Sequence, residues 1–106
     1  MTKVSILLIC ATGMSTTMLV SKMKRAAKEQ DLEVSITAVS ANEAATQFGS
    51  RELDMVLLGP QVRYMKSKVR KQLQGSNVAV EVIDIKDYGK MNGEKILSDA
   101  LSLVNP

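Results

Sequence analysis

The chain has 106 residues, about the size of one domain, so we expect a single domain over residues 1–106 with one ordinary core. Hydrophobic residues make up 45% and charged residues 24%, close to an average soluble protein, which excludes disorder and a coiled coil. Fourteen Lys and Arg against eleven Asp and Glu leave a net charge of only +3, which argues against nucleic acid as a partner.

The start of the chain resembles no secretory signal, and no apolar run approaches the roughly 20 residues that cross a bilayer. A cytoplasmic location without membrane insertion is therefore expected. The chain contains no histidine, so it lacks an imidazole of its own for base catalysis, metal binding or phosphohistidine formation. We expect neither a metal site nor a cofactor. The single cysteine, Cys10, is either a buried apolar residue or a reactive thiol.

Four apolar stretches, each followed by a helical pattern, predict a parallel α/β sheet. Residues 4–10 and 53–58 are almost continuously apolar, as expected of central strands, whereas residues 32–39 and 78–85 include the polar positions of edge strands. Right-handed crossovers give the strand order 2-1-3-4, with helices on both faces. The winding reverses between the first and third strands, and such a doubly wound sheet binds ligands at the carboxyl ends of these strands.

The predicted helices have recognisable ends. Ser40 and Glu43 have the spacing of a capping box and begin a short helix that ends near Phe48. Pro60 suits the first turn of the third helix. The first helix covers residues 14–29, and the last covers residues 93–103. The inward stripe of the first helix is expected to contain Met18, Leu19, Met23, Ala26 and Ala27.

The loop after the first strand carries the residues best suited to chemistry. Cys10 stands next to the start of a helix, where unpaired N–H groups and the helix dipole favour negative charge and would stabilise a thiolate. Gly13 allows the backbone to curl closely around an oxyanion. We therefore predict Cys10 as a nucleophile above a phosphate cradle formed by Ala11, Thr12, Gly13, Met14, Ser15, Thr16 and Thr17. The alternative is that Cys10 is a core residue and Gly13 only permits a turn.

The absence of certain residues from the loop argues against two classes of enzyme. It has no Gly-Lys-Ser/Thr ending, which argues against nucleotide hydrolysis. Cysteine phosphatases place an Arg six residues after the cysteine and use an Asp-Pro pair as the acid, but position 16 is Thr and the chain contains no Asp-Pro. A cradle that accepts a phosphoryl group but activates water poorly suits a phosphoryl carrier.

The cysteine loop, the segment Leu57-Leu58-Gly59-Pro60-Gln61 and the stretch from Val82 to Gly89 resemble the IIB component of the lactose/cellobiose family of the bacterial sugar phosphotransferase system. The resemblance implies a fold similar to low-molecular-weight phosphatases. It also implies that Cys10 accepts a phosphoryl group from a histidine of a IIA protein and passes it to a sugar held by the membrane permease, IIC. Two alternatives stay open: a low-molecular-weight phosphatase or arsenate reductase, and a non-catalytic binding module.

Three further residues are candidates for the rim of the site or for partner binding. Pro60 and Gln61 follow the third strand and should stand beside Cys10, while Tyr88 lies in the predicted loop 86–90 after the fourth strand. The alternatives are purely structural: Pro60 and Gln61 would form a strand-to-helix turn, and Tyr88 would pack over the final helix. A basic face of Arg63, Lys66, Lys68, Arg70 and Lys71 is either solvated or contacts an acidic partner or a membrane surface.

Overall fold

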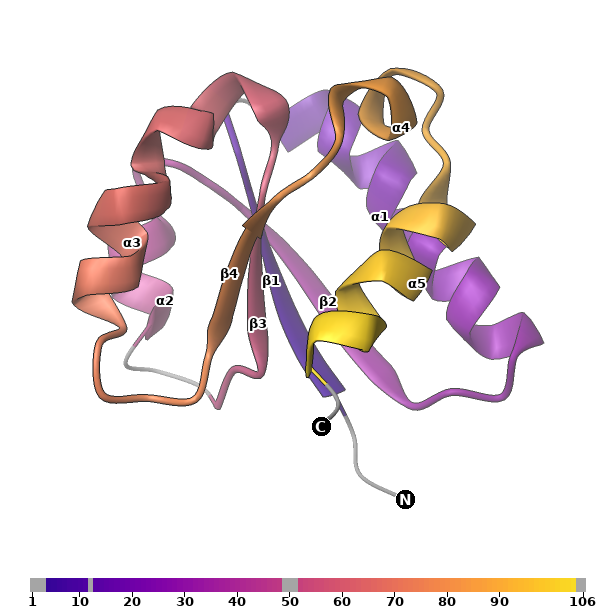
Figure 1. Cartoon of the computed structure of the whole chain (residues 1–106). Coiled ribbons are helices and arrows are strands. Elements are labelled where there is room, and N and C mark those ends of the chain that lie inside the picture. Colours follow the sequence, from indigo (N-terminus) through magenta and orange to yellow (C-terminus); the bar gives the residue numbers. More distant parts are fainter. Residues whose placement is uncertain (1–3, 12, 49–51, 105–106) are drawn as a thin grey trace.

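The computed structural model describes residues 4–11, 13–48 and 52–104. Four parallel strands form one sheet in the order β2-β1-β3-β4, as the sequence predicts (Figure 1). The central strands are β1 (Val4–Cys10) and β3 (Met55–Leu58), and the edge strands are β2 (Val34–Ser40) and β4 (Ala79–Val82). The doubly wound α/β fold class is therefore confirmed.

Helices cover both faces of the sheet. One face is covered by α1 (Gly13–Glu29) and α5 (Gly93–Val104), and the other by α2 (Ala44–Phe48), the 3-10 helix η1 (Pro60–Met65) and α3 (Lys66–Gln72). A short helix, α4 (Ile85–Gly89), lies at the carboxyl edge of the sheet, together with η1 and the start of α1 (Figure 1). The carboxyl edge of the sheet therefore brings together segments from the beginning, the middle and the last quarter of the chain. None of the described helices is long and apolar enough to cross a bilayer.

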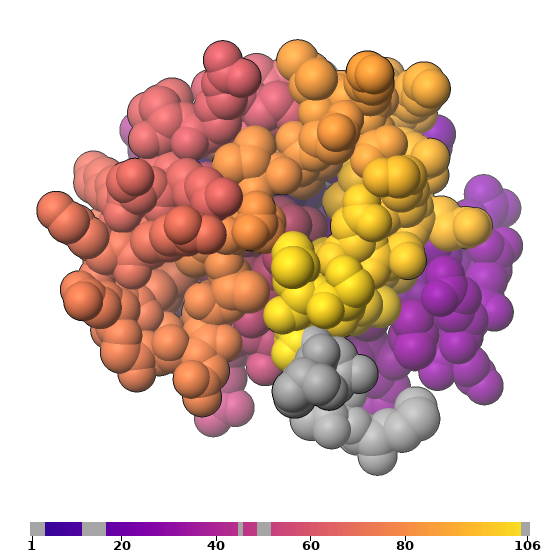
Figure 2. All heavy atoms as spheres, in the orientation of Figure 1, coloured from indigo at the N-terminus to yellow at the C-terminus, as the bar shows by residue number. Residues whose placement is uncertain are grey.

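The core has two parts, one on each face of the sheet. Ile6 and Leu8 of β1 pack with α1 and α5, whereas Leu7 and Ile9 pack against the side of α2, η1 and α3. Successive residues of a strand point to opposite faces, so a strand covered on both sides must be apolar throughout. In the space-filling view, β4 lies between α3 and α5 at the molecular surface (Figure 2).

The second and third strands begin two residues later than predicted. Asp31 adopts a left-handed φ of 61°, and the Leu32 N–H donates to the Ala27 carbonyl, so residue 32 closes α1 instead of starting β2. Before β3, the Asp54 carboxylate accepts a hydrogen bond of 2.8 Å from the Ser5 N–H. The Asp54 N–H in turn donates to the Ser5 carbonyl oxygen over 2.9 Å, so Ser5 bonds to both the side chain and the backbone of Asp54.

The predicted end of the fourth strand is wrong. β4 stops at Val82, and Asp84 caps the unpredicted helix α4 by accepting a 2.8 Å hydrogen bond from the Lys86 N–H. Ile85, which the apolar pattern placed in the strand, begins α4 and is largely exposed. Most of the predicted loop 86–90 is therefore helical.

The helices differ from the prediction in the inward face of α1, in the continuity of the third helix and in the start of α2. Met18 is exposed, and Val20 is buried on the inward face of α1. The third helix is two pieces, the 3-10 helix η1 and α3, and Val62 inside η1 departs from helical geometry. Before α2, the Ser40 hydroxyl donates to the Glu43 carboxylate at 3.0 Å, but residues 41–43 form a turn and the helix begins only at Ala44. The two side chains thus contact each other without forming the predicted capping box at the start of the helix.

Candidate functional site

The carboxyl ends of β1 and β3 lie side by side, as predicted. The Gly59 N–H, directly after β3, donates to the Ile9 carbonyl oxygen over 2.9 Å. The same strand β1 ends at Cys10, and α1 begins three residues later at Gly13. The switch point of the sheet therefore brings the cysteine, the start of a long helix and the segment after β3 into one place.

Cys10 is buried, with 2% of its surface exposed. Its Sγ donates a hydrogen bond to the Val39 carbonyl oxygen of β2 over 3.5 Å, and its own carbonyl accepts from the Ala41 N–H over 2.9 Å. The thiol thus rests as a donor against the neighbouring strand. Each of the two sequence interpretations agrees with one feature of Cys10. Its burial is that of a core residue, and its position is at the strand end where open α/β sheets bind ligands.

The predicted cradle starts with Ala11, which is exposed. Thr12 and the side chains of Met14, Ser15 and Thr16 lie outside the described residues, and the backbone from Gly13 onward is the first turn of α1. The first four N–H groups of a helix lack carbonyl partners within the helix and carry its positive partial charge. α1 has no acidic residue in its first turn, so nothing on that turn competes with an anion. Thr17 is exposed on the same helix.

The candidate rim residues Gln61 and Tyr88 surround Gly59. A Cβ atom added to Gly59 would lie 3.3 Å from the Gln61 Oε1, 3.5 Å from the Ile9 carbonyl oxygen and 3.8 Å from the Tyr88 Cε1. The absence of a side chain at Gly59 therefore lets Gln61 and Tyr88 approach the end of β1. Pro60 begins η1 between these groups. All three residues named from the sequence thus lie beside the strand that ends in Cys10.

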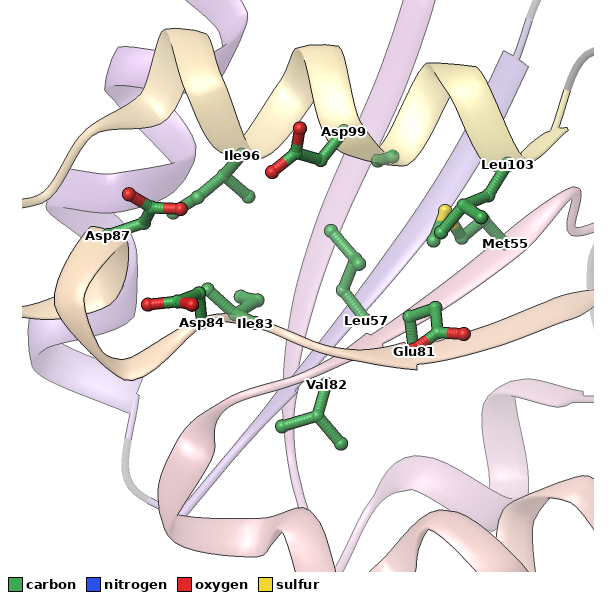
Figure 3. A pocket seen from close by; sticks show the side chains of 11 residues that line it. Met55, Leu57, Glu81, Val82, Ile83, Asp84, Asp87, Ile96, Asp99 and Leu103 are labelled. Atoms are coloured by element: carbon green, nitrogen blue, oxygen red, sulfur yellow. The ribbon is translucent and has the colours of Figure 1, made fainter.

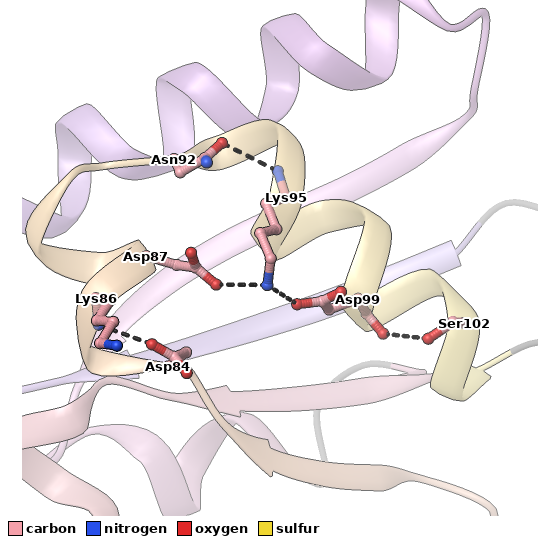
Figure 4. Close-up of polar contacts among 7 residues, drawn as sticks. All are labelled: Asp84, Lys86, Asp87, Asn92, Lys95, Asp99 and Ser102. Atoms are coloured by element: carbon pink, nitrogen blue, oxygen red, sulfur yellow. Dashed lines mark hydrogen bonds and ion pairs between the residues drawn. The ribbon is translucent and has the colours of Figure 1, made fainter.

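An ion-pair network fastens α4, and with it Tyr88, to α5 (Figure 4). Asp87 has 8% of its surface exposed and is the only charged residue that is buried among the described residues. The Lys95 Nζ lies 2.9 Å from the Asp87 Oδ2 and 3.0 Å from the Asp99 Oδ2. These hydrogen bonds, the one to Asp87 first, raise the pKa of Lys95 above its ordinary value of 10.5.

The sequence interpretation missed this network, which positions one of its candidate rim residues. The available signal is Asp84, an N-cap residue type two residues after the fourth strand, which would have predicted the start of α4. Contact between Asp87 and Lys95 could not be read from the chain, because it depends on how α4 packs against α5.

A cavity of about 130 Å³ lies between β4 and α5 (Figure 3), and Cys10 is not one of the residues that line it. Apolar side chains and four carboxylates line it. Each carboxylate has a structural partner: Glu81 pairs with Lys66 and Arg70, Asp87 and Asp99 pair with Lys95, and Asp84 caps α4. The four carboxylates that line the cavity are therefore accounted for by contacts that hold the fold together. Within the described parts of the chain, no three His, Cys, Asp or Glu side chains group as a metal site requires.

The chain is similar to known proteins over almost its whole length. It is 44% identical over 103 residues to the galactose-specific EIIB component of Lactococcus lactis subsp. cremoris, covering 94% of this chain and 95% of the relative. It is 43% identical over 103 residues to the cellobiose-specific EIIB component of Lactococcus lactis subsp. lactis, with the same coverage. The oligo-beta-mannoside-specific EIIB component of Bacillus subtilis is 43% identical over 99 residues, covering 93% of this chain and 94% of the relative.

Two solved structures share the fold. The lactose-specific IIB component domain of the phosphoenolpyruvate:carbohydrate phosphotransferase system (PTS) from Streptococcus pneumoniae superposes with a TM-score of 0.85 at 16% identity, covering 98% of this chain and 100% of that one. The cellobiose-specific phosphotransferase IIB component from Borrelia burgdorferi gives a TM-score of 0.77 at 35% identity, covering 98% of this chain and 94% of that one.

The family model described as "PTS system, Lactose/Cellobiose specific IIB subunit" matches residues 5–99, which include Cys10 and the three candidate rim residues. Together with the parallel sheet in the order 2-1-3-4, this match shows that the chain belongs to the lactose/cellobiose-specific IIB family of the sugar phosphotransferase system.

Proposed function

We propose that this protein is the cytoplasmic phosphoryl carrier of a bacterial sugar phosphotransferase system, with Cys10 as the residue that is phosphorylated. The donor is a phosphohistidine of a IIA protein, and the acceptor is a sugar of the lactose, cellobiose or chitobiose type bound by the membrane permease IIC. One observation carries the proposal: the only cysteine of an IIB-family chain ends the central strand β1, three residues before α1 begins.

Transfer takes place in two displacements at phosphorus. In the first, the Cys10 thiol loses its proton to water and the thiolate sulfur attacks phosphorus. The P–N bond to the donor imidazole breaks, and its electron pair returns to the ring nitrogen. In the second, a sugar hydroxyl loses its proton to water as its oxygen attacks the phosphocysteine, and the P–S bond breaks with its electron pair returning to sulfur. The chain has no histidine, so the donor phosphohistidine and any imidazole base come from other molecules.

The resting contact of Cys10 requires a change before the first displacement. The thiol donates to the Val39 carbonyl oxygen and is almost completely buried. The sulfur must leave this acceptor and turn toward the start of α1, where N–H groups can neutralise the phosphoryl oxygens. The backbone from Ala11 to Thr17 is the proposed cradle, with the hydroxyls of Ser15, Thr16 and Thr17 as further donors.

A carrier fits the residues better than a phosphatase does. Thr16 stands where a cysteine phosphatase needs an Arg, and no Asp-Pro pair supplies an acid for the leaving group. The carboxylates of Asp84 and Asp87, on the segment nearest to Tyr88, are engaged as a helix cap and in an ion pair. Neither of these two carboxylates is therefore free to act as a base for water, which favours keeping the phosphoryl group for the sugar.

Intact-mass analysis after incubation with a phosphorylated IIA protein tests the proposal. One added phosphoryl group on the wild type, absent from a folded Cys10→Ser variant, is the expected result. The matched control is Ser98→Ala, an exposed position on α5 that should accept phosphate normally. No adduct with a donor that phosphorylates another IIB protein would reject the proposal.

Two further measurements address the alternatives. Release of inorganic phosphate from an aryl phosphate, lost in Cys10→Ser, would identify a phosphatase or arsenate reductase. Undiminished sugar uptake in cells that carry Cys10→Ser would identify a binding module without catalysis.

A further inference from the structure

The positive charge of this protein lies in two segments. Residues 1–28 and residues 55–80 each contain five Lys and Arg and no Asp or Glu, whereas the rest of the chain has four Lys and Arg against eleven Asp and Glu. The overall charge of +3 therefore comes from two basic segments on an otherwise acidic protein. The second segment forms β3, η1, α3 and the turn before β4, and its strand β3 ends beside the end of β1.

Not all five cations are available to a partner. Lys66 and Arg70 lie 3.3 Å and 3.9 Å from the two carboxylate oxygens of Glu81 on β4. Arg63, Lys68 and Lys71 are exposed and form no ion pair within the part of the chain that the structure describes. Tyr64, 76% exposed, lies next to Arg63. We define the α3 face as Arg63, Tyr64, Lys68 and Lys71.

The α3 face begins at the edge of the sheet that carries Cys10. η1 follows Gly59, whose N–H bonds to the end of β1, and α3 then runs away from that edge along the sheet (Figure 1). Arg63 lies in η1, next to this edge, and Lys71 lies near the far end of α3. Exposed charges are screened beyond about 8 Å at physiological ionic strength, so Arg63 is the cation that acts most strongly on a surface facing the carboxyl edge.

We propose that the α3 face binds the anionic headgroup surface of the membrane and so holds the carboxyl edge, with Cys10, toward a membrane-embedded acceptor. The location of that acceptor rests on the proposed function, whereas the surface itself rests on charge and exposure. Exposed tyrosine beside Lys and Arg is typical of segments that lie at the headgroup level. Unpaired cations along a helix also suit a diffuse anionic surface, because each Lys or Arg adds attraction without a fixed geometry.

Co-sedimentation with lipid vesicles tests this inference on the unphosphorylated protein. Vesicles of equal parts phosphatidylglycerol and phosphatidylcholine should bind the wild type, and vesicles of phosphatidylcholine alone should not. The triple variant Arg63→Gln, Lys68→Gln, Lys71→Gln should bind the anionic vesicles at least tenfold more weakly, since each cation near such a surface strengthens binding by about fivefold. High salt should abolish the wild-type binding.

A matched variant separates the surface from the net charge. Lys24→Gln, Arg25→Gln, Lys28→Gln removes three exposed cations from α1, on the opposite face of the sheet and far from the start of that helix. It should retain most of the vesicle binding. Equal weakening by both triple variants, or no binding of the wild type to anionic vesicles in low salt, would overturn the inference. Circular dichroism checks that both variants fold.

An acidic protein partner is the competing occupant. Slower phosphoryl transfer from a soluble IIA protein to the α3-face variant, with vesicle binding unchanged, would assign the face to that partner and reject the membrane. The vesicle measurement needs no phosphoryl transfer and can be repeated with Cys10→Ser. A failure of the proposed carrier function is thus distinguishable from a failure of this inference.

Discussion

At the scale of single residues, Asp87 connects the fold to the candidate site. Its buried carboxylate receives the Lys95 ammonium, and the next residue, Tyr88, approaches Gly59 at the end of β1. The second partner of Lys95, Asp99, is exposed and lies one turn further along α5. Burial makes the first pair the more important one, because a carboxylate that loses its partner there is poorly rehydrated.

We expect Asp87→Asn to lower the free energy of unfolding by about 1 kcal/mol, because the amide cannot form the charged hydrogen bond to Lys95. Asp99→Asn, the matched control in an exposed pair, should cost about 0.5 kcal/mol or less. Urea denaturation followed by circular dichroism measures both. Equal effects of the two substitutions would contradict a special role for the buried carboxylate.

The pH dependence of this contact follows from Lys95. Its pKa is raised in the folded state, so the contribution of the charged amine is fully present below the unfolded value of 10.5 and is lost as the pH rises beyond the folded value. The difference in thermal midpoint between wild type and Lys95→Met should therefore stay constant from pH 6 to pH 9, where the chain has no histidine to titrate, and shrink only in strongly alkaline buffer. A difference that already disappears at pH 8 would contradict this assignment.

At the scale of elements, the contact between α1 and α5 holds the helix that begins after the cysteine loop. A Cβ atom added to Gly93, the first residue of α5, would lie 2.8 Å from two backbone atoms of α1, the Lys22 carbonyl carbon and the Met23 nitrogen. Backbone atoms cannot rotate away as a side chain end can, so the two helices would have to separate. The position of α1 thus depends on a glycine 80 residues beyond the start of that helix.

We expect Gly93→Ala to destabilise the fold by roughly 1–3 kcal/mol, as overpacking of a close helix contact does. Gly89→Ala is the matched control, since a Cβ atom there has no atom within 4 Å. Chemical denaturation of the two variants gives the comparison. If Gly93→Ala matched or exceeded the wild type in stability, the close approach of α5 to α1 would not limit that position.

At the scale of the whole molecule, both parts of the core share the same four strands. Leu97 of α5 and Val69 of α3 are each fully buried but lie on opposite faces of the sheet. Because β1 and β3 contribute side chains to both faces, loss of either part exposes apolar residues of the same central strands. The two layers should therefore unfold together, as expected for a single domain.

We predict that Leu97→Ala and Val69→Ala each shift one common unfolding transition. The expected losses are about 2–5 kcal/mol for Leu97→Ala and roughly 1–3 kcal/mol for the smaller side chain of Val69. Far-UV circular dichroism and amide hydrogen exchange in urea follow the whole chain and its separate helices. Two transitions, or protection lost only in the layer that carries the substitution, would contradict a single cooperative unit.

Much of the site could be predicted because it follows from sheet topology. The apolar pattern identified β1 and β3 as central, and the switch point then placed Cys10, Gly59, Pro60 and Gln61 near one another. The structure agrees, with Gly59 bonded to the end of β1. The role of Cys10 as the phosphorylated residue stays a prediction, as does the cradle from Ala11 to Thr17.

The sequence alone established the order of the strands, their parallel direction and which of them are central. Hydrophobic periodicity and the right-handed crossover rule can both be applied to the chain segment by segment. Tertiary structure decided the start of β3, the burial of Asp87 and the resting contact of the thiol. Each of these depends on packing between separate elements, such as the contact of Asp54 with Ser5, 49 residues away, or of Val39 with Cys10, 29 residues away. Such contacts form only after the sheet has assembled, so no local pattern encodes them.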